Sequence, residues 1–113
     1  MSDINQVVLS GNLQVTDKGK PRLAYTQSGK PVISFTLITT YKEFKTYHNI
    51  VWWSETDGFL DLPNGARVMV EGRIGTRSWE KDGQKHYRTE ITASKVEFEK
   101  AISNQPDEGD IPF

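Results

Sequence analysis

Short stretches of alternating apolar and polar residues, separated by turn signals, run along almost the whole chain. The clearest is VISFTLITT, in which Ile33, Phe35 and Leu37 fall on one side and the intervening residues on the other. This alternation is typical of a half-buried strand. Comparable runs cover residues 6–14, 47–53, 67–80 and 85–98. The pattern predicts an all-β domain of five strands without a long helix.

Glycines and prolines divide these runs. TDKGKP (16–21) and SGKP (28–31) predict turns, and DG at 82–83 predicts a hairpin tip. Gly11 predicts a bend or bulge, whereas Gly72 and Gly75 permit the curvature that a closing barrel needs.

The segment ETDGFLDLPNGA (55–66), between the third and fourth strands, carries Phe59, Leu60 and Leu62. It predicts a short helix or an apolar loop plug. Five curved strands with such an insert outline an OB-fold, a five-stranded Greek-key barrel, although another small β-barrel fits the same pattern.

Composition narrows the class of protein. The chain has 113 residues, 35% of them hydrophobic, and a mean hydropathy of −0.59, which predicts a single domain with a lean core. It contains no cysteine, so neither a disulfide framework nor a cysteine zinc site is expected. No signal peptide or apolar span is evident, and we expect a cytoplasmic protein.

Charge is unevenly distributed, although the net charge is only −1. Three of the acidic residues, Asp107, Glu108 and Asp110, lie in the last seven positions, and every lysine and arginine lies at or before Lys100. The body is therefore mildly basic and the end acidic. On charge alone, an ordinary mixed surface is the better explanation.

Little supports an enzyme. The two histidines, His48 and His86, have no metal-ligand spacing with each other or with a pair of carboxylates. A phosphate loop is excluded around Gly29-Lys30, because Pro31 stands where Ser or Thr is required. We expect neither catalysis nor a cofactor or bound metal.

Aromatic side chains beside cations are the strongest functional signal. In YHNIVWW, strand alternation places Ile50 and Trp52 toward the core and leaves Tyr47 and Trp53 pointing outward. The fourth strand carries Arg73, Arg77, Trp79 and Lys81 with one parity, and YKEFKTY supplies Tyr41, Lys42, Phe44 and Lys45.

This combination suits single-stranded nucleic acid. Unpaired bases expose π-faces, and aromatic stacking contributes roughly 1–3 kcal/mol per base without distinguishing sequence. Lysine and arginine near phosphates add counterion release. Each side chain also has a simpler explanation, as part of the core, the barrel rim, a loop contact or a solvated surface.

The same segments give a family resemblance. NQVVLSGNL (5–13), LAYTQSGKPVISFTLITT, YHNIVWW, VEGRIGTRSWEKDGQ, HYRTEI and the terminal DIPF together resemble the bacterial and phage single-stranded DNA-binding proteins, the SSB family. The resemblance covers nearly the whole chain. It implies an OB-fold domain over residues 1–100 and a short, flexible, acidic C-terminal tail over 101–113.

The resemblance also implies residue roles. Tyr47, Trp53 and Trp79 match base-stacking positions, Arg77 matches a phosphate contact, and His48 matches a histidine near the subunit interface. Members of this family usually form homotetramers that protect single-stranded DNA during replication, recombination and repair; a dimer is the alternative here.

The family's acidic tip docks into replication, recombination and repair proteins. The resemblance assigns this role to Asp110, Ile111, Pro112 and Phe113, with the apolar side chains filling a pocket and the acids meeting basic residues. The short tail resembles that of a phage- or plasmid-borne member.

Three departures from the family remove positive charge: Gln6, Asn49 and Gly75 stand where basic residues are usual. We therefore predict weaker and more salt-sensitive binding than is normal for the family. Two other functions fit the same residues, namely a protein–protein adaptor and a single-stranded RNA binder.

Overall fold

The computed structural model of the protein describes residues 3–56 and 58–99. Its elements are β1 (Val7–Leu13), β2 (Arg22–Tyr25), β3 (Pro31–Tyr41), β4 (Phe44–Trp52), η1 (Phe59–Asp61), β5 (Arg67–Lys81) and β6 (Gln84–Phe98). The predicted tail at 101–113, including Asp110, Ile111, Pro112 and Phe113, lies outside the described residues. No helix in the described part is long and apolar enough to cross a membrane.

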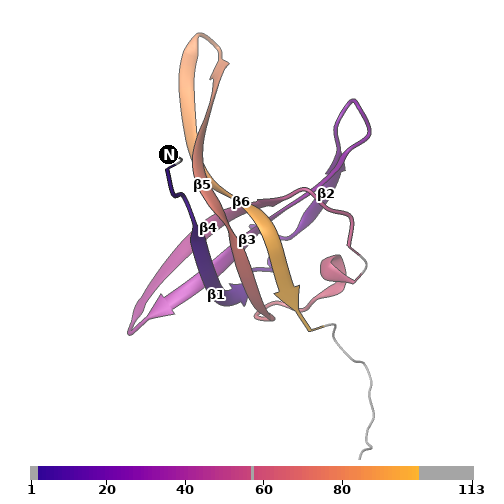
Figure 1. Ribbon diagram of the computed structural model, residues 1–113, viewed down its shortest axis with the longest axis vertical. Coiled ribbons are helices and arrows are strands. Elements are labelled where there is room, and N and C mark those ends of the chain that lie inside the picture. The colour runs from indigo at the N-terminus through magenta and orange to yellow at the C-terminus, as the bar shows by residue number, and fades with distance from the viewer. Residues whose placement is uncertain (1–2, 57, 100–113) are drawn as a thin grey trace, which may run out of the picture.

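The strands form one curved sheet in the order β1-β5-β6-β4-β3-β2, and an additional pairing of β1 with β3 closes five of them into a barrel (Figure 1). All neighbouring strands are antiparallel except β4 and β6. This arrangement confirms the predicted all-β barrel. The sixth strand, β2, was not predicted, because RLAY is a four-residue edge strand with little alternation.

Alternation along the strands builds the core. Phe35, Leu37 and Ile50 are buried as predicted, as are Val68 and Val70 of β5. The insert provides the plug: Phe59 and Leu62 are buried, whereas Leu60 is exposed. Further buried residues complete the core: Leu13, Ile33, Ile91 and Ala93.

Two glycines are required by close backbone approach. A Cβ on Gly11 would lie 2.3 Å from the carbonyl oxygen of Ile38, and one on Gly72 would lie 2.1 Å from that of Thr92. The register of β1 against β5 runs through Gly11 without a shift, so the bulge considered there does not form. The irregularity occurs instead between β5 and β6 at Glu71 and Gly72.

Two hairpins extend from the barrel in different directions (Figure 1). The β5–β6 hairpin turns through Asp82 and Gly83, both with positive φ, which confirms the predicted tip. The β3–β4 hairpin turns between Tyr41 and Phe44, and Lys42 has a φ of 56°. Most of the predicted nucleic-acid residues lie on these hairpins or on the sheet between them.

Candidate nucleic-acid interface

The buried residues show which side of the sheet faces away from the core. This side is called the outer face below. On β4, Ile50 is buried and Trp52 packs against the core. Tyr47, Asn49 and Val51 therefore belong to the outer face. Tyr47 is 57% exposed, as expected for a side chain available to a ligand.

The same rule extends the outer face across β6 and β5. Ile91 and Ala93 of β6 are buried, so Glu90 and Thr92 point outward. On β5 the buried Val68 and Val70 leave a row of outer-face positions, which contains Arg73, Gly75, Arg77, Trp79 and Lys81. Thr92 lies opposite Arg73 on one side and Val51 on the other, so β4, β6 and β5 present one continuous surface.

Trp79 is supported by two neighbours on the β5–β6 hairpin. Its ring stacks on that of His86, directly across the hairpin, with centroids 5.6 Å apart and planes 21° apart. The Arg77 guanidinium carbon lies 4.9 Å from the Trp79 ring centroid. Trp79 remains 38% exposed. Sequence reasoning missed His86, although its place opposite Trp79 follows from the hairpin turn.

An acidic residue stands among these cations. Arg77 donates from Nε to Glu90 Oε1 at 3.3 Å and from Nη2 to Oε2 at 3.1 Å, a bidentate pair. Arg88 Nε lies 3.7 Å from Oε2 of the same carboxylate. The hydrogen bonds that Arg77 donates to Glu90, and then the negative charge of Glu90, raise the pKa of Arg77. Arg77 thus has a partner within the protein, and its predicted contact with phosphate stays a prediction.

The β3–β4 hairpin divides a set of residues that the sequence placed together. Lys45 and Tyr47 belong to the outer face, whereas Tyr41 and Phe44 are paired with each other on the opposite side. Lys42 lies in the turn, with Nζ 5.5 Å from the Tyr41 ring centroid. Tyr41, Lys42 and Phe44 therefore do not share one surface with Trp79.

Trp53 directly follows the end of β4 rather than continuing it. The Ser54 N–H donates to the Trp52 carbonyl at 2.9 Å, which turns the chain around Trp53. Trp53 is 51% exposed, whereas Trp52 packs edge-on against Phe59. The predicted division of the two tryptophans, one inward and one outward, is confirmed.

His48 has core-side parity but is only half-buried. Its Nε2 lies 2.9 Å from the Thr39 hydroxyl, and burial lowers its pKa. Its place at the subunit interface stays a prediction.

Three positions lack the basic residue that is usual in the family, and each has different surroundings in the structure. Gly75 lies opposite Glu90 on β6, and a Cβ there would meet nothing within 4 Å. Asn49 belongs to the outer face of β4. Gln6 donates from Nε2 to Glu71 Oε2 at 3.2 Å. The predicted weaker binding stays a prediction. The greater salt sensitivity predicted with it does not follow, because fewer phosphate contacts release fewer counterions and give a shallower dependence on salt.

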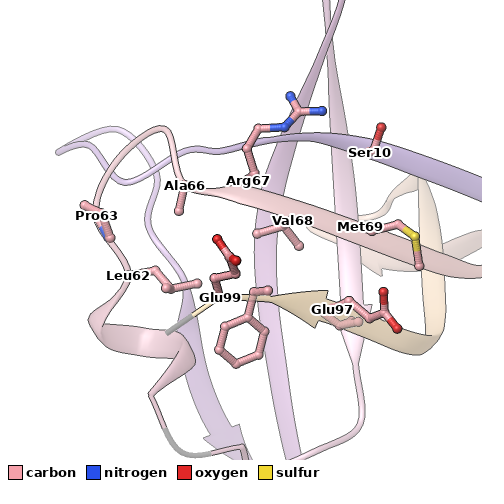
Figure 2. A pocket seen from close by; sticks show the side chains of 11 residues that line it. Ser10, Leu62, Pro63, Ala66, Arg67, Val68, Met69, Glu97 and Glu99 are labelled. Atoms are coloured by element: carbon pink, nitrogen blue, oxygen red, sulfur yellow. The ribbon is translucent and has the colours of Figure 1, made fainter. Parts of the chain in front are cut away.

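A larger hollow than the one on the outer face lies where β6 ends near the insert. Its volume is about 1230 Å³, and Leu62, Ala66 and Val68 border it, with Arg67 and Glu97 also in its lining (Figure 2). None of the predicted nucleic-acid residues lines it. A smaller hollow of about 330 Å³ adjoins Arg73 and Thr92 on the outer face.

Fold and surface together define a small β-barrel with aromatic and cationic groups on one sheet face. Residues 4–99 match the model of the single-strand binding protein family. The chain belongs to this family. Membership makes it a binding protein rather than an enzyme.

Curated relatives agree with this assignment. Single-stranded DNA-binding protein 1 of Chlorobaculum tepidum is 34% identical over 108 residues, which are 84% of this chain and 64% of the relative. Single-stranded DNA-binding protein 1 of Xylella fastidiosa is 31% identical over 111 residues, 87% of this chain and 79% of the relative.

A solved structure agrees on the fold. The protein in a Plasmodium falciparum SSB complex with ssDNA matches with a TM-score of 0.72 and 25% identity, over 87% of this chain and 96% of that chain. This likeness confirms the predicted OB-fold.

Proposed function

We propose that the protein binds single-stranded DNA with little sequence preference, by stacking bases on exposed aromatic rings and by holding phosphates on nearby cations. The observation that carries this proposal is the shared outer face of β4, β6 and β5, where Tyr47, Trp79 and Arg73 are exposed. A duplex conceals the faces of its bases, so single strands should bind better.

Family membership supports the cellular role. The protein would cover single strands formed during replication, recombination and repair, and it would act in the cytoplasm, where the DNA of its bacterial relatives lies. We further propose that residues 110–113 recruit partner proteins and that the protein acts as a homo-oligomer, with a tetramer favoured over a dimer and His48 near the subunit interface.

Fluorescence and anisotropy titrations test the binding proposal. Oligo-dT should quench the emission of the wild-type protein, because Trp53 and Trp79 are exposed. With labelled oligo-dT, Trp79→Leu and Tyr47→Leu should each weaken binding by about 5- to 150-fold, the equivalent of roughly 1–3 kcal/mol per lost stack.

Tyr87→Leu is the matched control. Tyr87 is an exposed aromatic on the same hairpin, but it lies opposite Ser78 on the other face from Trp79. Its loss should change affinity less than twofold. Equal losses from Tyr87 and Trp79 would place the binding surface elsewhere. Absence of any binding to oligo-dT would favour the adaptor, and tighter binding of oligo-rU in parallel titrations would favour the RNA binder.

A further inference from the structure

Strand pairing places an arginine at each end of one row across the barrel. Arg73 of β5 lies opposite Thr92 of β6, which lies opposite Val51 of β4. Val51 lies opposite Ser34 of β3, which lies opposite Arg22 of β2. The row therefore crosses five strands, and at about 4.8 Å per strand it is roughly 19 Å long, measured along the curved sheet.

Every member of this row points to the outer face. On β2 the inward residue is Leu23, which pairs with buried Ile33 and packs against the core. Arg22, its neighbour, therefore points outward. Ser34 stands between the buried Ile33 and Phe35, so it points outward for the same reason.

The two arginines differ from Arg77. Within residues 3–56 and 58–99, neither Arg22 nor Arg73 makes an ion pair, and both are exposed. Arg77 is held by Glu90. Arg22 and Arg73 can therefore approach a phosphate without first giving up a carboxylate partner.

The surface between the arginines carries only small side chains, and it is polar at both ends. Ser34, Val51 and Thr92 are small side chains that leave no bulky group across the row. The hollow beside Arg73 and Thr92 lowers one end further. At the other end, the turn before β2 adds exposed Lys18 and Lys20 against one acid, Asp17.

We propose that a single-stranded DNA segment lies along this row, with Arg73 and Arg22 holding phosphates at opposite ends. This proposal rests on the binding function proposed above and adds Arg22, a phosphate-binding residue that sequence reasoning missed. It also gives the orientation of the DNA segment on the sheet. A segment held by both arginines must cross the β-strands rather than run parallel to them.

The salt dependence of binding tests the role of Arg22. Each phosphate contact with single-stranded DNA contributes about 0.7 to the slope of log K against log salt concentration. Arg22→Gln should make that slope shallower by about 0.7, so the affinity advantage of the wild type should shrink about 2- to 3-fold between 50 and 200 mM salt. Arg22→Lys should retain the wild-type slope, and Arg22→Gln with Arg73→Gln should remove about 1.4.

Arg67→Gln is the matched control. It removes the same charge at the beginning of β5, where Arg67 pairs with Asn12 and lies outside the row. Its slope should equal that of the wild type. An equal change of slope in both variants would mean that the loss of net charge, and not a contact of Arg22, explains the effect. An unchanged slope for Arg22→Gln would refute the role of Arg22. Both results leave the proposed function intact, whereas a wild-type protein that ignores oligo-dT would refute that function itself.

Discussion

Two aromatic clusters in this small barrel serve opposite purposes. In the interior, the Phe59 ring meets Phe35, Trp52 and Phe98 with centroids 4.8, 5.5 and 5.1 Å away. On the β5–β6 hairpin, Trp79 has His86 and Arg77 as its neighbours. The interior ring is surrounded by other rings and removed from water, whereas the hairpin ring is supported by polar groups and remains partly exposed.

Local structure alone explains neither position. Phe59 begins a single 3-10 turn after Gly58, which has a φ of 90°, and the turn is closed by Leu62 N–H to the Phe59 carbonyl at 3.2 Å. So short a turn gains little from its own hydrogen bonds. Burial of the Phe59 ring stabilises the turn, and the ring in turn closes the end of the barrel. Trp79 instead lies on a long hairpin whose backbone bonds hold it without burial.

The largest expected effect follows from this contrast. Phe59→Ala should lower the free energy of unfolding by about 3–5 kcal/mol, because it leaves a cavity among three other rings. Trp79→Ala should cost about 1 kcal/mol, since its ring is partly exposed and loses one stacked partner. Denaturant unfolding followed by circular dichroism measures both.

Leu60→Ala serves as the control within the same turn. Leu60 is 42% exposed, and its truncation should change stability by no more than about 0.5 kcal/mol. Similar losses for Leu60 and Phe59 would mean that the turn itself, rather than burial of the Phe59 ring, closes the barrel.

A smaller effect is expected from Glu90, which holds Arg77 beside the exposed Trp79 ring. Glu90→Gln should tighten oligo-dT binding several-fold at low salt and steepen the salt slope by about 0.7, because Arg77 becomes available to a phosphate. The comparison variant is Glu97→Gln, which removes an equal charge from an exposed pair with Lys95 at 3.2 Å, farther along β6. Weaker binding by Glu90→Gln would show that Arg77 must be held over Trp79 to assist stacking.

Strand parity was enough to predict the two tryptophans and the interior of the barrel. It separated Trp52 from Trp53 and placed Trp79 with Arg77, because both statements concern residues that are close neighbours in the sequence. At the β3–β4 tip, the predicted grouping of Tyr41 and Phe44 with Tyr47 rested on their closeness in one segment, not on parity. Tyr41 pairs with Phe44, and the two-residue turn puts this pair on the opposite side of the sheet from Tyr47.

Relations between strands needed the structure. Glu90 was missed as the partner of Arg77, and Arg22 was missed at the end of the row. The contact of Glu90 with Arg77 depends on the register of β6 with β5. The place of Arg22 in the row depends on several registers in succession, those of β5 with β6, β6 with β4, β4 with β3 and β3 with β2. Turn geometry and the burial of one face of the sheet set these registers, and alternation within one segment does not by itself identify the partner of a residue on another strand.

The smallest expected effect concerns a ring between the two extremes, the half-buried imidazole of His48. Burial lowers its pKa from the ordinary value of 6.5, so the unfolded chain binds a proton more readily than the folded protein. Stability from this group is therefore complete above that ordinary value and is lost as the pH falls toward the lowered pKa. His48→Gln keeps a hydrogen-bonding group near Thr39 but cannot titrate. Between pH 7 and pH 5 the denaturation midpoint of the wild type should fall more than that of His48→Gln, and parallel curves would show that the imidazole takes up its proton without a cost to folding.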